Sequence, residues 1–135
     1  MRIKRSAFEA LLAQARAELP NESCGYLFGT ADDADLAVEH FPMTNADHSP
    51  EHFSFVPAEQ FAALRAARAE GRRIIANWPS HPASPSRPSQ EDIRLANDPS
   101  ILYCILSLQA EDPVFNAFRI VGGQVQKFNV DVVDD

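Results

Sequence analysis

The fold of this 135-residue chain is decided by residues 77–92, which read Asn-Trp-Pro-Ser-His-Pro-Ala-Ser-Pro-Ser-Arg-Pro-Ser-Gln-Glu-Asp. The stretch joins an apolar run, residues 74–76, to a short helical pattern that starts near Gln90. Its prolines predict a stiff loop with few backbone donors. His81 at the end of a predicted strand and Asp92 at the start of the next helix can therefore converge on one point. Imidazole nitrogen and carboxylate oxygen are both zinc ligands.

Outside this stretch, hydrophobic periodicity predicts helices and strands in alternation. Ser6 and Glu9 form a capping-box pattern at the start of the first helix. Pro57 suits the first position of a second helix, in which Phe61, Leu64 and Ala67 are predicted to share the apolar face. The remaining predicted elements are a helix at residues 90–96 and strands at residues 23–30, 35–43, 72–78, 101–108, 114–121 and 125–133. This order predicts a single α/β domain over residues 1–135, with three layers and a mixed β-sheet flanked by helices.

Composition limits the classes of partner. The net charge of -7 disfavours nucleic acid, because phosphates need Lys and Arg to replace their counterions. No apolar run approaches the ~18 residues of a membrane span, and no signal-peptide pattern opens the chain. We therefore expect a cytoplasmic protein with no membrane or nucleic-acid partner. Cys24 and Cys104 lie in apolar runs and are predicted to be reduced thiols in the core.

The spacing of His81, Ser89 and Asp92 matches the second half of a known signature, His-x-His-x7-Ser-x2-Asp. This is the signature of the JAMM, or MPN-plus, metallopeptidases, and Glu22 stands in a Glu-x-Cys-Gly context that is also similar to theirs. Over roughly residues 5–133 the chain resembles the compact stand-alone bacterial members. The resemblance implies a JAMM/MPN-like fold, which is related to the cytidine deaminase fold. One position departs, because Pro79 stands where the family has its first histidine.

The resemblance also implies roles for the matching residues. It implies a zinc-dependent peptidase or isopeptidase in which His81 and Asp92 bind the metal. Glu22 would act as general base and acid, and Ser89 would stabilise the oxyanion. The substrate that the family implies is the C-terminal tail of a ubiquitin-like protein, such as the small sulfur carriers of cofactor and cysteine biosynthesis. An extended tail can add to a sheet edge and so reach the metal.

Pro79 has no side-chain donor atom, so His81 and Asp92 are the ligands that remain from the family's triad. Two protein ligands make a weak site, because catalytic zinc usually has three. His48 or His52, in the irregular segment before the second helix, is an alternative third ligand. In the other interpretation, zinc is weakly held or absent and the chain is a catalytically inactive MPN-like module. Such a module would bind a ubiquitin-like tail, another protein or a second copy of itself.

Each of these residues also has an ordinary structural explanation. Ser89 and Asp92 by themselves form a capping box after Pro88. Glu22 by itself is an exposed loop carboxylate, and a loop histidine such as His48 is usually just solvated. The coincidence of the spacing pattern with a distant Glu-x-Cys-Gly favours the site. A zinc deaminase on a related fold is a weaker alternative, because its His-x-Glu and Pro-Cys-x-x-Cys signatures do not occur in the sequence.

Overall fold

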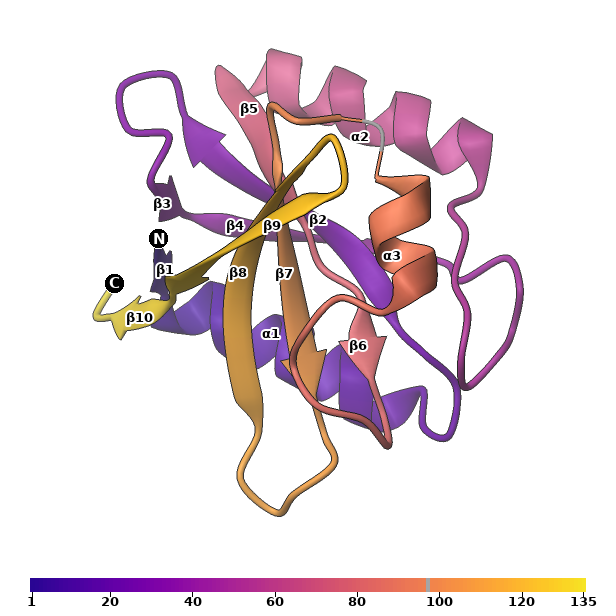
Figure 1. Cartoon of the computed structure of the whole chain (residues 1–135). Coiled ribbons are helices and arrows are strands. Elements are labelled where there is room, and N and C mark those ends of the chain that lie inside the picture. Colours follow the sequence, from indigo (N-terminus) through magenta and orange to yellow (C-terminus); the bar gives the residue numbers. More distant parts are fainter. Residues whose placement is uncertain (97) are drawn as a thin grey trace.

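A computed structural model describes residues 1–96 and 98–135 (Figure 1). The elements are β1 (Arg2–Lys4), α1 (Arg5–Ala17), β2 (Cys24–Thr30), β3 (Leu36–Ala37), β4 (Glu39–Met43), α2 (Pro57–Ala69), β5 (Arg72–Asn77), β6 (Ser80–His81), α3 (Gln90–Leu95), β7 (Leu102–Ser107), β8 (Val114–Val121), β9 (Gln124–Asn129) and β10 (Asp131–Val133). Across these residues, the central sheet has seven strands in the order β4-β2-β5-β7-β8-β9, with β6 paired to β7. A small parallel sheet, β10-β1-β3, lies beside it.

The central sheet is mixed and has helices on both faces, which confirms the predicted three-layer α/β fold. Parallel pairing occurs where β7 meets β5 and β6, and the other neighbours are antiparallel. Leu27 packs in the cluster under α1, whereas its neighbour Phe28 packs under α2. In the same way, Cys104 of β7 packs in the cluster under α1, and its neighbour Tyr103 packs in the cluster under α3. This alternation follows from the period of two along a strand, and it makes β2 and β7 buried on both faces.

The face that α2 presents to the sheet differs from the prediction. Phe61 is 64% exposed and Leu64 is 39% exposed, while Ala63 and Ala67 are buried. The two alanines pack in one cluster with the large ring of Phe28. Since the sheet already supplies bulky side chains there, small residues on the helix fill the space that remains. The predicted face was therefore right for Ala67, which packs against the sheet, and wrong for Phe61 and Leu64.

Three further predictions about element ends were wrong. The first helix begins at Arg5 with Lys4 as its N-cap and has no side-chain cap, and the Ser6 N–H donates to Asp135 instead of forming a capping box. Residues 35–43 form two strands that are interrupted at Val38. The last predicted strand divides at Val130 because β10 leaves the central sheet to pair with β1.

Two expectations from composition can be compared with the structure. Cys24 and Cys104 are both buried and free, as predicted. Burial raises the pKa of each thiol, to about 12 for Cys104, so neither is a reactive thiolate. In the described part of the chain, we find no helix that combines the length and the apolar character needed to cross a membrane.

Backbone hydrogen bonds hold residues 78–81 from both sides. The predicted strand ends at Asn77, and β6 resumes the strand at Ser80 after Trp78 and Pro79. The bonds run from Trp78 N to Gly25 O (2.9 Å), from Ser80 N to Ser23 O (2.9 Å), from Leu106 N to Pro79 O (3.0 Å) and from Leu108 N to His81 O (3.1 Å). The segment therefore lies between the start of β2 and the end of β7.

We predict that Gly25→Ala destabilises the fold by about 1–3 kcal/mol, as overpacking of a core does. A Cβ atom at Gly25 would overlap the Trp78 indole nitrogen and would lie 2.6 Å from the Phe41 carbonyl oxygen, and neither the ring nor the backbone can move away freely. Urea denaturation followed by fluorescence measures the change, because Trp78 is the only tryptophan in the sequence. Gly29→Ala is the control and should cost less, because its nearest neighbours include the flexible end of Ile75. Equal stabilities for the two variants would contradict this account.

Candidate functional site

The central loop brings His81 and Asp92 together. His81 Nε2 lies 3.3 Å from Asp92 Oδ2, and both side chains are about nine-tenths buried. His81 Nδ1 lies 3.0 Å from the Pro85 carbonyl oxygen, which can only accept, so Nδ1 carries a hydrogen. Burial lowers the pKa of His81, but its hydrogen bonds to Asp92 and Pro85 outweigh burial and raise that pKa overall. Burial raises the pKa of Asp92, but His81 and the Ser89 N–H outweigh it and lower that pKa overall, so the two shifts both favour the charged forms of the pair.

Glu22 lies next to this pair, two residues before the start of β2. Its backbone N–H donates to the Ser49 carbonyl (2.8 Å), and its carbonyl accepts from Asn45 Nδ2 (3.0 Å). The residue is only 3% exposed, so it is not the solvated loop carboxylate of the ordinary explanation. Burial raises the pKa of Glu22 to about 8, partly opposed by His81 and assisted by Asp92. At neutral pH its carboxyl group is therefore mostly protonated.

Ser89 is the N-cap of α3. Its Oγ accepts from the Asp92 N–H (3.0 Å), and Asp92 Oδ2 accepts from the Ser89 N–H (2.8 Å), which together make a capping box. The same Oδ2 faces His81, so the cap also holds the carboxylate toward the histidine. Ser89 itself is exposed, and its oxyanion role stays a prediction.

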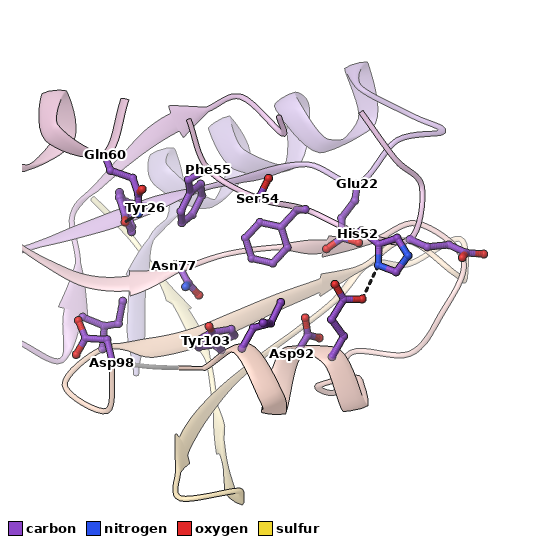
Figure 2. A pocket seen from close by; sticks show the side chains of 15 residues that line it. Glu22, Tyr26, His52, Ser54, Phe55, Gln60, Asn77, Asp92, Asp98 and Tyr103 are labelled. Carbon is purple, nitrogen blue, oxygen red and sulfur yellow. Dashed lines mark hydrogen bonds and ion pairs between the residues drawn. The ribbon is translucent and has the colours of Figure 1, made fainter. Parts of the chain in front are cut away.

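A pocket of about 380 Å³ opens between residues 51–55 and α3 (Figure 2). Glu22 and Asp92 lie at one end, which we call the motif end. Across its mouth, His52 Nδ1 lies 2.5 Å from Glu91 Oε2 and joins the loop to α3. The opposite end, which we call the tyrosine end, is formed by Tyr26, Gln60, Asn77, Asp98 and Tyr103.

The tyrosine end was missed by the sequence reasoning. The sequence did contain a signal for Asn77. Side chains two residues apart lie on the same face of an extended strand, so residues 77 and 79 share a face with His81, which the motif already identifies. Tyr26 and Tyr103 carried no such signal. They come from β2 and β7, whose distance from the loop is set only by the order of strands in the sheet.

The donors around the motif do not make a three-ligand metal site. Pro79 is fully buried and has no donor atom, His52 is paired with Glu91, and His48 lines a separate hollow. Over residues 1–96 and 98–135, no group of three or more His, Cys, Asp or Glu side chains is placed to hold a metal ion. His81 and Asp92, which face each other, supply two ligands at most. They therefore do not fit the zinc site with three protein ligands that the resemblance implies. That His48 or His52 supplies a third ligand stays a prediction.

We predict that Glu22 makes stability depend on pH. An unfolded glutamate loses its proton near pH 4.5, whereas Glu22 in the folded protein loses it near pH 8. Between these values the folded state binds more protons than the unfolded state, so the free energy of unfolding falls as pH rises, by at most ~1.4 kcal/mol per pH unit. Glu22→Gln removes this slope. The free energy of unfolding of the variant minus that of the native chain should therefore increase from about pH 5 to about pH 8.

Urea denaturation across this pH range measures the difference. Glu51→Gln changes an exposed glutamate that lines the same pocket, and it should leave the slope unchanged. A native chain and a Glu22→Gln variant with parallel pH profiles would show that Glu22 is not protonated in the fold.

Comparisons with known proteins agree with this geometry. The family model for prokaryotic homologs of the JAB domain matches residues 4–121. The CysO-cysteine peptidase of Mycobacterium tuberculosis is 33% identical over 135 residues, which cover 98% of this chain and 90% of that protein. A protein from Desulfitobacterium hafniense has a solved structure with 41% identity and a TM-score of 0.89, over 100% of this chain and 94% of its own.

A more distant structure shows how widely the fold is shared. A JAB1/MPN domain protein from Archaeoglobus fulgidus has a TM-score of 0.65 at 20% identity, over 99% of this chain and 100% of its own. The extent of the family match and the identity to the mycobacterial relative agree with the spacing of His81, Ser89 and Asp92. This chain belongs to the prokaryotic homologs of the JAB domain, within the JAMM/MPN family.

Proposed function

We propose that this chain binds the extended C-terminal tail of a small ubiquitin-like protein, of the sulfur-carrier kind, in the pocket between residues 51–55 and α3. The observation that carries the proposal is a pocket that leads from the tyrosine end to Glu22 and Asp92. Family membership and a relative named as a CysO-cysteine peptidase support a peptidase-like function. The same relative's name supports a sulfur carrier as the class of partner.

The lining of the pocket suits an extended peptide. Its volume of about 380 Å³ lies within the ~300–1,000 Å³ that is usual for ligand pockets. Phe53, Phe55 and Leu95 offer apolar surface, while Ser54 and Gln60 offer hydrogen-bonding groups. A peptide backbone needs both, because its amides must replace their bonds to water when they are buried.

Glu22 supplies a specific contact for the end of the tail. Because its pKa is about 8, its carboxyl group can donate an O–H at neutral pH, and a peptide carbonyl can accept it. Asp92 cannot compete as a donor, since its pKa is lowered and it is paired with His81. The motif end therefore presents one neutral donor, on Glu22, beside a carboxylate that is already paired with His81.

A zinc-dependent peptidase is the second candidate. It is favoured by the burial of Glu22, His81 and Asp92 around the same end of the pocket. Against it, Pro79 leaves two of the three ligands, and we expect zinc to be weakly held or absent. No hydrolytic step follows from the native donor set, so tail binding is the function that the site supports best.

We predict that a purified sulfur-carrier protein binds the native chain and that removing the last few residues of the carrier abolishes binding. Because Glu22 donates only when protonated, Kd should rise as the pH passes through about 8. Glu22→Gln keeps an N–H donor and should give an affinity that does not change over this pH range. Glu22→Leu should bind up to about tenfold more weakly near pH 7, the loss expected for one hydrogen bond.

Isothermal titration calorimetry measures these affinities, with Glu51→Gln as the control for charge at the pocket mouth. A carrier that binds equally well without its tail would contradict the proposal. An affinity of the native chain that is independent of pH would contradict the role given to Glu22.

We further predict that the native chain loses zinc on dialysis and that Pro79→His retains it. The new imidazole would lie two residues before His81 on an extended segment, so both rings face Asp92. Changes in the outer shell alter metal affinity ~10–100-fold, and an added direct ligand should exceed that. Elemental analysis and a cleavage assay on a ubiquitin-like protein with a C-terminal extension measure the outcome.

Glu22→Gln in the Pro79→His background separates the two roles of the motif. It should abolish any new cleavage and leave zinc bound, because Glu22 is assigned to the proton and not to the metal. Stoichiometric zinc in the native chain would instead indicate His48 or His52 as the missing ligand. If Pro79→His binds zinc no better than the native chain, residues 79, 81 and 92 do not share a metal position.

A further inference from the structure

The pocket is lined by acidic side chains, and binding the backbone of a peptide does not by itself require them. Five carboxyl side chains line it, those of Glu22, Glu51, Glu91, Asp92 and Asp98. Among its lining residues there is no Lys or Arg, and the one histidine, His52, is already paired with Glu91. Glu22 and Asp92 belong to the motif end, whereas Asp98 lies at the tyrosine end. The tyrosine end therefore has a carboxylate of its own that the motif does not use.

Aromatic rings surround this part of the pocket. The Tyr26 and Phe55 rings have centroids 4.9 Å apart at an interplanar angle of 47°, and Phe53 meets Phe55 edge-on at 5.5 Å. Tyr103 lies opposite them, on the side of α3 (Figure 2). The faces of such rings attract cations through their negative quadrupole, and a nearby carboxylate strengthens that attraction.

Asn77 adds a buried acceptor that has no donor. It is 6% exposed and neighbours the Tyr103 hydroxyl, and Figure 2 shows its amide directed into the pocket. Its Oδ1 is shielded from water and receives no hydrogen bond from any described residue. Leaving a buried acceptor unpaired is unfavourable, and a donor that enters from the pocket and meets the amide after a small rotation of the Asn77 side chain would recover that cost. Carboxyl groups alone would not define a site, but a buried oxygen without a partner, in a ring of aromatic side chains, indicates a ligand that donates.

We propose that the tyrosine end is a subsite for a basic side chain, lysine or arginine, that the bound tail carries upstream of its C-terminus. The inference rests on the proposed tail-binding function and specifies the tail sequence that the pocket selects. The aromatic rings would contact the side-chain stem and its cation, Asp98 would supply the opposite charge, and Asn77 Oδ1 would accept one N–H. An apolar residue at this position would leave Asn77 Oδ1 unpaired.

A neighbouring hollow limits where the cation can lie. Tyr26, Asp98 and Ile101 also line a second hollow, which carries Arg68, Arg72 and Arg73. Arg72 is paired with Glu39 and Glu70. A basic side chain that passed beyond Asp98 would meet these arginines, so the subsite ends there. An acidic residue in the tail would be repelled inside the pocket, and this makes charge reversal a direct test.

The test uses synthetic peptides with a free C-terminus that carry Lys, Ala or Glu at each upstream position in turn. At one position, Lys should bind the native chain roughly threefold to thirtyfold more tightly than Ala, and Glu should bind no better than Ala. Asp98→Asn and Asn77→Leu should each remove most of this preference, measured within each variant as the ratio of its affinities for the Lys and Ala peptides. Asp112→Asn, an exposed acid on the β7–β8 loop, is the matched control and should keep the preference.

Equal affinity for Lys and Ala at every position would overturn the inference, as would tighter binding of Glu. A Lys preference that survives both Asp98→Asn and Asn77→Leu would overturn it too, because the general negative charge of the pocket would then be the cause. If no peptide binds, the proposed tail-binding function fails, and titration with n-butylammonium followed by NMR decides the inference by itself. A saturable shift of the Tyr103 ring that is lost in Asp98→Asn would support the subsite, and its absence would overturn it.

Discussion

The whole site depends on the backbone hydrogen bonds that hold residues 78–81 between β2 and β7. Because side chains alternate along this segment, Trp78 is buried in the cluster under α1, while His81 points toward Asp92 of α3. Gly25 leaves the space that the Trp78 ring occupies. The histidine is therefore carried by a strand of the sheet and not by the loop that follows it, and strands hold functional groups more rigidly than loops do.

The motif end buries three ionisable groups without leaving two negative charges side by side. His81 and Asp92 are paired with each other, and one further position on each is satisfied, because Asp92 Oδ2 also accepts from the Ser89 N–H and the Pro85 carbonyl accepts from His81 Nδ1. Such satisfaction is what makes a buried ion pair tolerable. Glu22 remains protonated at neutral pH, because burial and Asp92 both disfavour a second carboxylate.

Local patterns predicted most elements of the fold and failed where tertiary partners decide. The continuous apolar run at residues 101–108 became β7, and Gly122 and Gly123, both with positive φ, form the turn of the β8–β9 hairpin. The exposed face of α2 could not be predicted, since Phe61 and Ala63 belong to overlapping apolar stripes of one helix. Which stripe turns inward depends on the size of the side chains that the sheet presents. The small parallel sheet was missed because β1 pairs with β10, the other end of the chain.

For the site, the sequence by itself determined the family and the residues of the motif end, because a fixed spacing across one loop is a local property. His81, Ser89 and Asp92 needed no knowledge of distant contacts, and Pro79 could be read directly as a missing donor. Only the tertiary structure decided that Glu22 is buried and protonated, that His52 pairs with Glu91, and that a tyrosine end exists. The physical reason is that burial, and the pKa values that follow from it, are set by side chains brought from several strands and loops by the sheet order. Spacing along the chain carries no record of that order.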